Sequence, residues 1–393
     1  MSAGEDDIKH ARFDQARAAD VIRNIRPDDP LALFRPDTLA RTAQTFRRGF
    51  PGHVSYAVKA NPAPEILKEL ASVGVTTFDV ASVAEMRAAR LADPAARLHY
   101  HNPIRSLSEI AEAKSLGIAS WSVDRLSELN KLGPVPAGTE IAVRLSLKRG
   151  GGAYDFGSKF GASPNEATEL LRTVAKRGLT PAMTFHPGTQ CTDPSSWADY
   201  IAACAGIAQA AGVRLASLNV GGGFPASGDL VPSQLHVIFA AIERAVATHF
   251  PADPPHIWCE PGRAMVADSV WLLLRVKARS GQTLYLNDGL YGALGEWRDM
   301  PVPERQVALT PTGQPVTGSD VAFTIFGPTC DSLDRVPGVW DLPEDTNEGD
   351  YILLTGAGAY SLALVTGFNG YGTRDFATLQ SFRDRAGQHP HGG

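Results

Sequence analysis

The stretch Val54-Ser55-Tyr56-Ala57-Val58 is a short, β-forming apolar run, and Lys59 follows it directly. Amphipathic stretches such as Pro64–Val73 and Val83–Ala92 separate it from later runs of the same kind. Those runs are Thr76–Val80, Leu98–Tyr100, Ala119–Val123, Glu140–Leu147, Pro181–His186, Leu215–Val220 and His256–Glu260. Strands that alternate with helices pair in parallel through right-handed crossovers. Eight such units predict an α/β fold, a (β/α)8 barrel, and an open doubly wound sheet is the alternative.

A different pattern begins after Arg263. Four β-rich runs follow with turn-rich segments between them instead of helices: Val270–Ala278, Thr283–Asn287, Val321–Phe326 and Tyr351–Thr355. This pattern indicates a second, mostly β domain. Because Leu31–Arg35 could pair with it, we expect the β domain to be built from both ends of the chain. The predicted divisions are 1–35 in the β domain, 36–267 in the barrel and 268–393 in the β domain.

The composition excludes several classes of protein. The 393 residues are 44% hydrophobic and carry a net charge of −5, so the chain can bury a large core and presents no basic footprint for nucleic acid or an anionic membrane. We find no apolar stretch long enough for a membrane span and no secretory signal. The four cysteines show neither a CxxC pair nor metal-ligand spacing, so we expect no metal and a reducing cytoplasm.

Reactive residue types recur where the barrel strands end, which is where barrel enzymes place their active sites. In chain order they are Lys59, Asp79, Arg144, His186, Gly221-Gly222-Gly223 and Glu260. A lysine that closes an apolar strand is partly desolvated, which lowers its pKa and makes the amine nucleophilic. Consecutive glycines let backbone N–H groups approach a phosphate.

Each of these residues also has a plainer interpretation. Lys59 could be a surface lysine, and Asp79 could cap a helix. The glycine run could form a tight turn, His186 could be a core histidine, and Glu260 could form an internal ion pair with Arg263. The repeated placement at strand ends favours the functional interpretation.

The β domain contributes a second set of candidates. Cys330 stands in the turn-like string Gly327-Pro328-Thr329-Cys330-Asp331, where a buried filler cysteine is not expected. Tyr360 follows a run of glycines and alanines that would let its ring approach a ligand. Phe368 precedes the turn Asn369-Gly370. For both aromatic residues, ordinary core packing is the alternative.

Taken together, six strings in one order resemble the pyridoxal-phosphate-dependent ornithine/diaminopimelate/arginine decarboxylase family. They are Tyr56–Asn61, Phe78–Ser82, Gly221–Pro225, Glu260–Arg263, Gly327–Asp331 and Phe368–Gly370. The resemblance extends from about Leu31 to Gly372. It implies an alanine-racemase-like barrel with a β domain, pyridoxal 5'-phosphate as cofactor, and decarboxylation of an L-amino acid to an amine and carbon dioxide.

The resemblance also implies a role for each matching residue. Lys59 would form the Schiff base, His186 would stack on the ring, and Glu260 would bond the ring nitrogen. The phosphate and the rest of the cofactor would meet Asp79, Arg144, Thr189, Gly221, Gly222, Gly223, Gly262, Arg263 and Tyr360. Cys330 would return a proton to the substrate, whose side chain would meet Asp331, Tyr291 and Phe368. The family implies a homodimer with shared active sites, in which Asp334 and Lys159 lie at the interface.

The substrate is less strongly indicated. Cys330-Asp331 resembles the ornithine branch, and Asp299 would hold a distal amine, so we expect ornithine first and polyamine-type chemistry. Arg298 precedes Asp299 and would favour a distal carboxylate if it faced the pocket; we expect Asp299 to face inward. A non-catalytic regulatory homologue, a racemase of the same fold and a barrel hydrolase are the competing functions. Each of these competing functions leaves Lys59, the glycine run or Cys330 without a role.

Overall fold

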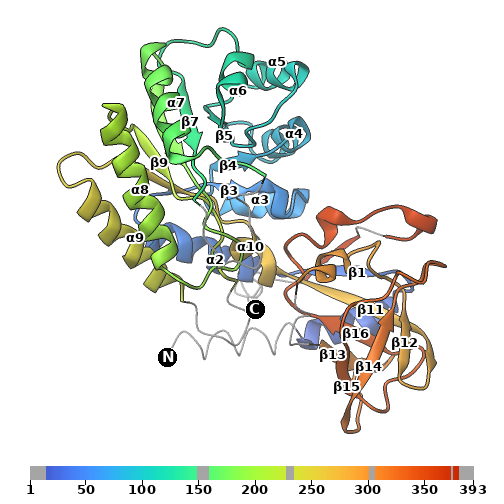
Figure 1. Ribbon diagram of the computed structural model, residues 1–393. Coiled ribbons are helices and arrows are strands. Elements are labelled where there is room, and N and C mark those ends of the chain that lie inside the picture. The colour runs from blue at the N-terminus through green and yellow to red at the C-terminus, as the bar shows by residue number, and fades with distance from the viewer. Residues whose placement is uncertain (1–14, 148–158, 227–233, 301–305, 373–374, 380–393) are drawn as a thin grey trace, which may run out of the picture. The chain divides into compact units, whose positions relative to one another are not determined.

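The computed structural model describes residues 15–147, 159–226, 234–300, 306–372 and 375–379. By their internal contacts, the described residues between 41 and 265 form one compact unit, and those before and after them form a second. Figure 1 labels many of the helices and strands of both units.

The first unit is built on nine short parallel strands. They are β2 (His53–Val54), β3 (Tyr56–Ala57), β4 (Thr77–Val80), β5 (Arg97–Tyr100), β6 (Ser120–Val123), β7 (Glu140–Arg144), β8 (Thr180–Thr184), β9 (Ser217–Asn219) and β10 (His256–Cys259). Their order is β2-β10-β9-β8-β7-β6-β5-β4-β3. Only Ser55 separates β2 from β3, so the two ends of the sheet meet in one continuous stretch of chain and the sheet closes. The predicted (β/α)8 barrel is therefore confirmed, with its first strand split in two.

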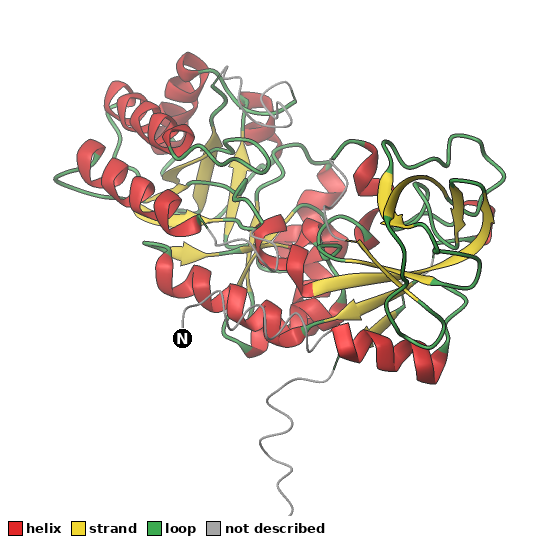
Figure 2. Ribbon diagram, turned by 90° about the horizontal axis from the view of Figure 1, so that it is seen from below, coloured by secondary structure: helices red, strands yellow, loops and turns green. Residues whose placement is uncertain are grey.

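Helices follow the strands and lie outside them, as Figure 2 shows. The helix α2 (Pro36–Gly49) precedes the barrel strands. Between the strands lie α3 (Pro64–Ser72), α4 (Val83–Ala92), α5 (Leu107–Ser115), α6 (Leu126–Lys131), α7 (Pro164–Lys176), α8 (Ser195–Ala211) and α9 (Leu235–His249). Ser106 and Ser163 each form a capping box with the glutamate three residues on, which satisfies N–H groups that the first turn of a helix leaves free.

The second unit is mostly β. Its strands are β1 (Leu31–Phe34), β11 (Val270–Ser280), β12 (Thr283–Leu286), β13 (Gln306–Leu309), β14 (Asp320–Phe326), β15 (Trp340–Pro343), β16 (Tyr351–Leu354) and β17 (Phe376–Thr378). Their order is β13-β16-β11-β12-β14-β15, with β1 antiparallel to β11 and parallel to β17. The expected pairing of the segment at Leu31 with the β domain is therefore present. Short helical turns complete the fold: α10 (Arg263–Val266), η3 (Ala267–Ser269), η4 (Gly295–Arg298), η5 (Leu362–Leu364) and η6 (Phe368–Gly370).

Burial of its apolar side chains explains why β1 joins this sheet. Leu33 is fully buried and packs with Trp271, Leu273 and Leu353 in one hydrophobic cluster. The helix of residues 15–25 adds Ala18 and Ile22 to the same cluster. Sequence from both sides of the barrel thus builds one β-domain core. Within the described residues, none of the helices has the length and apolar character needed to traverse a bilayer.

Candidate active site

The strand-end candidates of the barrel lie at the carboxyl ends of its parallel strands. Lys59 stands in η1 (Val58–Ala60), directly after β3, and its side chain is exposed, so the expected partial desolvation of the amine is not found. Arg144 is the last residue of β7. Glu260 follows β10, and His186 comes two residues after β8. Asp79 lies one residue before the end of β4. Parallel strands bring these ends to one rim, so the fold gathers residues that are up to 201 positions apart (260 − 59).

The Glu260 carboxylate is the best-supported group of this cluster. Its Oε1 accepts hydrogen bonds from His101 Nδ1 and from the Asn219 side-chain amide, each at 2.5 Å. Among the described residues, no donor reaches Oε2. Burial raises the pKa of Glu260, but His101, Lys59 and Arg144 outweigh it and hold the pKa at about 2. Glu260 is therefore an ionised, nearly buried acceptor with one oxygen still available.

His101 and Asn219 were not predicted as site residues. Asn219 also accepts the Gly221 backbone N–H at 2.9 Å, so it joins the carboxylate to the glycine run. The sequence did contain a signal for His101, because His101 follows the predicted strand Leu98–Tyr100 just as Lys59 follows Val54–Val58. Asn219 lies inside a predicted strand, where the strand-end rule does not look.

His101 continues into a buried polar chain. Its Nε2 lies 3.0 Å from Ser120 Oγ, which in turn lies 2.6 Å from His99 Nδ1. Burial lowers the pKa of His101, but the charge and hydrogen bond of Glu260, together with Asp79, raise it above its usual value. Burial and the neighbouring His101 lower the pKa of His99 to about 3, so His99 is neutral.

The pKa of Asp79 is shifted in the opposite direction to that of Glu260. Its side chain is buried, and its Oδ1 has no hydrogen-bond partner among the described residues. Burial and the neighbouring Glu260 raise its pKa to about 7. One ligand atom each from Asp79, His101 and Glu260 lie within 4.8 Å of one another. These three residues would offer three metal ligands, whereas a closed structural zinc site uses four.

Positive charge borders these carboxylates. Arg144 is desolvated, which lowers its pKa, and lies near the charges of Glu260, Asp79 and Asp124. Burial, Lys59 and Arg144 lower the pKa of His186 to about 3, so its imidazole is neutral. His186 Nδ1 accepts the Gly188 backbone N–H at 3.2 Å, which leaves the proton on Nε2.

The glycine run admits no side chains. A Cβ at Gly221, where φ is +70°, would lie 2.0 Å from the Phe185 carbonyl oxygen. At Gly222 a Cβ would lie 2.7 Å from the Glu260 carbonyl oxygen and 3.3 Å from His186 Nε2. Gly223, with φ of +84°, leaves no room beside the Gly188 carbonyl oxygen, which a Cβ would approach to 2.1 Å. The run therefore brings bare backbone close to His186 and Glu260.

The remaining barrel candidates flank this run. Thr189 is half-buried in the loop between β8 and α8. Gly262 is buried, and its carbonyl oxygen accepts the Met265 N–H at 3.0 Å. Arg263 is half-buried at the first position of α10.

In the β unit, Cys330 and Asp331 stand together in an exposed turn. The Cys330 thiol donates to Asn369 Oδ1 at 3.4 Å, and its backbone N–H reaches the same oxygen at 3.3 Å. Tyr291 donates its hydroxyl to Asp331 Oδ2, and the Leu333 N–H donates to Oδ1 at 2.9 Å. These bonds lower the pKa of Asp331, so it is ionised. The structure therefore places an exposed thiol next in sequence to an ionised carboxylate.

Three further β-unit candidates lie in turns. Phe368 is exposed, with its ring centroid 4.6 Å from that of Tyr291, so the structure brings these two predicted residues together. Tyr360 has a φ of +61°, an uncommon backbone conformation for a residue with a side chain. Arg298 ends η4 and Asp299 follows it; both side chains are exposed, and which of them faces a substrate stays a prediction. A 3₁₀ turn does not alternate its side chains as a strand does.

The two residues expected at a dimer interface have different surroundings. Asp334 is buried and accepts hydrogen bonds from Thr329 Oγ1 and the Leu290 N–H, both at 2.7 Å. Lys159 is exposed, with its ammonium 5.0 Å from the Phe160 ring centroid. Their pairing across an interface stays a prediction.

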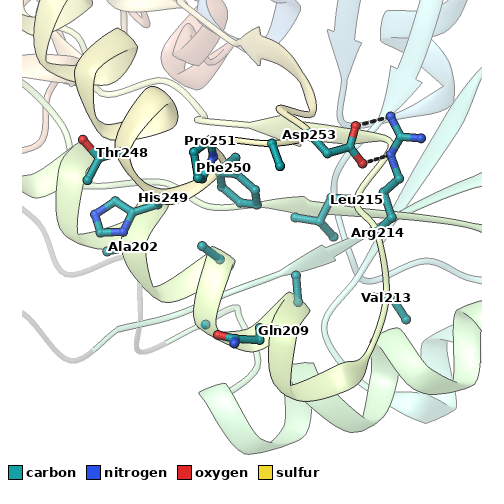
Figure 3. A pocket seen from close by; sticks show the side chains of 14 residues that line it. Ala202, Gln209, Val213, Arg214, Leu215, Thr248, His249, Phe250, Pro251 and Asp253 are labelled. Carbon is teal, nitrogen blue, oxygen red and sulfur yellow. Dashed lines mark hydrogen bonds and ion pairs between the residues drawn. The ribbon is translucent and has the colours of Figure 1, made fainter.

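A hollow of about 770 Å³ lies at the other end of the barrel (Figure 3). Its lining residues include Val213–Leu215 and Thr248–Asp253, which come just before β9 and β10, and Arg214 forms an ion pair with Asp253. The strand-end cluster follows the strands instead, so this hollow is separate from the candidate active site.

A closed (β/α)8 barrel with a lysine, a buried ionised carboxylate and a glycine run at its strand ends is the frame of a pyridoxal-type enzyme. Residues 37–267 match the family model described as pyridoxal-dependent decarboxylase, pyridoxal binding domain. The chain belongs to this family, and it is a pyridoxal-5'-phosphate-dependent amino-acid decarboxylase.

Similar proteins of known sequence and structure agree with this assignment. The chain is 31% identical over 377 residues to the lysine/ornithine decarboxylase of Selenomonas ruminantium, covering 93% of this chain and 92% of that protein. It is 30% identical to the ornithine decarboxylase of Mus musculus, covering 80% and 73%. The structure of Vibrio vulnificus lysine/ornithine decarboxylase with putrescine superposes with a TM-score of 0.80 at 27% identity, covering 93% and 98%. The Paramecium bursaria Chlorella virus arginine decarboxylase, at 23% identity and a TM-score of 0.84, shares the fold, covering 93% and 100%.

The barrel cluster fits the cofactor on its own geometry. Glu260 Oε2 receives no donor from the described residues, which suits a protonated ring nitrogen. The glycine run keeps the space beside His186 clear, because a Cβ at Gly222 would reach to 3.3 Å from His186 Nε2. An amine, an acceptor and a bare backbone segment are the three contacts that a phosphorylated pyridine aldehyde requires.

Proposed function

We propose that this enzyme decarboxylates an L-amino acid whose side chain ends in a cation, with ornithine first and lysine or arginine next. The observation that carries the proposal is the adjacent pair Cys330-Asp331, which sets an exposed thiol acid beside an ionised carboxylate. A substrate cation that leaves water needs an opposite charge, because its desolvation costs several kcal/mol otherwise. The names of the relatives, lysine/ornithine and ornithine decarboxylase, support the same class of substrate.

The barrel residues bind and orient the cofactor in this proposal. Lys59 provides the amine that attaches it, and His186, neutral and half-buried, packs on its ring. Glu260 holds a proton at the ring nitrogen through Oε2. When bound, pyridoxal phosphate supplies an electron sink for the electrons that the departing carboxylate leaves behind. Asp79 and Arg144 set the charge balance around this group.

A second set of residues binds the phosphate. The backbone N–H groups of Gly221–Gly223 approach it closely because no Cβ intervenes. Thr189 adds a hydroxyl, Gly262 lets the backbone approach, and Arg263 and Tyr360 contribute a guanidinium and a phenol.

Cys330 holds the proton that the reaction needs at its end. Its thiol donates to Asn369 Oδ1, so the proton is in place on Sγ before the substrate carboxylate is lost. We propose that Cys330 delivers this proton to the substrate α-carbon after carbon dioxide has left. Tyr291 and Phe368 position Asp331 and exclude water from the side chain that Asp331 binds.

A specific observation favours a second candidate substrate. The Arg298 guanidinium lies near enough to the Tyr291 hydroxyl to counter the rise in its pKa that Asp331 causes. An arginine beside the Tyr291–Asp331 pair would bind a distal carboxylate. The alternative function is therefore decarboxylation of an amino acid with an acidic or specialised side chain.

We also propose a homodimer with shared sites, in which one protomer's Lys59 and its partner's Cys330 serve the same substrate. We propose the domain boundaries 1–35, 36–267 and 268–393; the match of residues 37–267 to the family model supports the middle one. A cytoplasmic location stays a prediction, and cell fractionation checks it.

The experiment that tests the function is a substrate panel. Purified protein loaded with pyridoxal 5'-phosphate is incubated with L-ornithine, L-lysine, L-arginine, meso-diaminopimelate and L-glutamate, and carbon dioxide and amine are measured together. We expect equal amounts of both products from the basic amino acids. Turnover of diaminopimelate or glutamate alone would establish the alternative, and release of neither product from any substrate would overturn the function.

A further inference from the structure

A chain of buried polar side chains leads from Glu260 into the barrel wall. Glu260 Oε1 lies 2.5 Å from His101 Nδ1, His101 Nε2 lies 3.0 Å from Ser120 Oγ, and Ser120 Oγ lies 2.6 Å from His99 Nδ1. The His101 and Glu260 side chains are only 7% and 12% exposed. Burial makes these hydrogen bonds costly to lose, because an unpaired buried polar group has no water to replace its partner.

We propose that His101 is a positioning residue for Glu260, holding its Oε1 so that Oε2 stays available to the cofactor's ring nitrogen. The inference rests on the proposed role of Glu260 as the ring-nitrogen partner. His101 itself touches neither substrate nor cofactor in this proposal.

The geometry around the Glu260 carboxylate supports different roles for its two oxygens. His101 and Asn219 both donate to Oε1, and no described residue donates to Oε2. His101 directly follows β5, Asn219 ends β9 and Glu260 follows β10, so the three side chains meet only because the barrel closes. Two donors from separate parts of the barrel on one oxygen restrict the rotation of the carboxylate, which a single donor would not do.

The charges around His101 favour its hydrogen bond to Glu260. Carboxylates of Glu260, Asp79 and Glu140 face it, together with the neutral His99. Lys59 and Arg144 act on Glu260 from the other side.

The chain of hydrogen bonds from Glu260 to His99 Nδ1 can form in two arrangements, and His99 Nε2 has no partner among the described residues in either. When His101 carries both protons, Nε2–H donates to Ser120 Oγ, and the hydroxyl donates to His99 Nδ1. When His101 is neutral, the Ser120 hydroxyl donates to His101 Nε2, and His99 Nδ1–H donates to Ser120 Oγ. His101 Nδ1–H donates to Glu260 in both arrangements, so the positioning survives the titration of His101.

Two substitutions separate positioning from packing. His101→Asn keeps an amide donor near the place of Nδ1, whereas His101→Leu keeps volume and removes the donor. Ser120→Ala removes the support of His101, and Ser122→Ala is its matched control: the same substitution on the same strand, at a buried hydroxyl without a hydrogen-bond partner among the described residues. The dissociation constant of pyridoxal 5'-phosphate is measured by absorbance titration of each cofactor-free protein, together with its thermal melting.

We expect His101→Leu to raise this dissociation constant about tenfold, the effect of losing one hydrogen bond to a charged group. His101→Asn should stay within about threefold of the wild type, and Ser120→Ala should weaken binding more than Ser122→Ala does. Wild-type affinity in His101→Leu would overturn the proposal. So would equal losses in His101→Leu and His101→Asn, because packing alone would then explain them. Failure of the wild-type protein to bind the cofactor would refute the proposed function instead.

Discussion

At the scale of single residues, two carboxyl groups inside one barrel, the buried Asp79 and the nearly buried Glu260, have pKa values at opposite ends of the acidic range. The pKa of Glu260 is about 2 because His101, Lys59 and Arg144 stabilise its charge, whereas the pKa of Asp79 is about 7 because burial and Glu260 oppose ionisation. A titratable pair driven apart in this way is typical of an active site. Glu260 therefore keeps its negative charge at neutral pH, whereas Asp79 exchanges its proton near neutral pH.

The raised pKa of Asp79 predicts a pH-dependent stability. Between its unfolded value near 3.8 and its folded value of about 7, the folded protein binds more protons, so this group's contribution to stability is lost as the pH rises. Asp79→Asn removes the titration. Denaturant unfolding of the cofactor-free protein from pH 4 to pH 7.5 should show the variant gaining stability relative to the wild type as the pH rises.

His99 and His186, whose pKa values are lowered to about 3, act in the other sense but are present in both proteins, so the difference isolates Asp79. A constant difference between variant and wild type across this range would contradict the assignment.

Asp299 and Arg298 make opposite predictions about the substrate. If Asp299 pairs with a distal ammonium, Asp299→Asn should raise KM for ornithine by about tenfold or more with a smaller change in kcat, since a binding partner of the cation is lost. Arg298→Ala should then leave ornithine turnover unchanged. If Asp299→Asn has no effect while Arg298→Ala abolishes activity on an acidic substrate, the distal-carboxylate alternative holds.

At the scale of elements, glycine conformation shapes the loop after β9. Gly221 and Gly178 have the same φ of +70°, but a Cβ at Gly221 would lie 2.0 Å from the Phe185 carbonyl oxygen, whereas nothing lies within 4 Å of one at Gly178. The two positions therefore share the backbone strain and differ in steric contact.

Gly178→Ala should cost about 1–2 kcal/mol of unfolding free energy for the left-handed backbone. Gly221→Ala should cost about 1–3 kcal/mol more, because the Phe185 backbone must move. It should also weaken phosphate-dependent cofactor binding, which Gly178→Ala leaves intact. Equal losses of stability at both sites would show that the close approach at Gly221 has no energetic consequence.

Sequence predicted the barrel strands better than the strands of the β domain. Each barrel run is apolar and bounded by helical sequence, so its position is visible in the chain itself. The predicted strands omit β13, β15 and β17, which have four, four and three residues. Length alone does not set them apart, because the predicted β12 and β16 also have four residues; β13 and β17 are stabilised by pairing with the distant strands β16 and β1.

The site shows the same division between local and long-range information. Lys59, Glu260 and the glycine run stand out because the strand-end rule needs only local sequence. The contacts of Glu260 with His101 and Asn219 span 159 and 41 positions, and only closure of the barrel creates them. The exposure of both Arg298 and Asp299 follows from a 3₁₀ turn that no local pattern indicated.

At the scale of the whole molecule, the proposed chemistry is divided between the two units. Cys191, Cys204 and Cys259 of the barrel are buried, and burial raises the pKa of Cys204 and Cys259. Cys330 of the β unit is the exposed thiol among the four cysteines. The amine and the acid therefore come from different parts of the chain, which a dimer with shared sites would bring together.

This arrangement predicts complementation. Lys59→Ala and Cys330→Ala should each be inactive alone, but a hybrid dimer has one site with both residues intact. After subunit exchange, an equal mixture should recover about a quarter of the wild-type activity, because half of the dimers are hybrids with one intact site each. Native mass spectrometry of a size-tagged partner verifies the exchange. Proven exchange without any recovery of activity would count against shared sites.

The central claim is that Lys59, at the end of the first barrel strand, holds pyridoxal 5'-phosphate. Borohydride reduction of the loaded enzyme fixes the cofactor covalently to the lysine that carries it, and peptide mapping by mass spectrometry then identifies that lysine. The account predicts a single modified peptide containing Tyr56–Asn61 with the label on Lys59, and no label in Lys59→Ala. A label on any other lysine would contradict it.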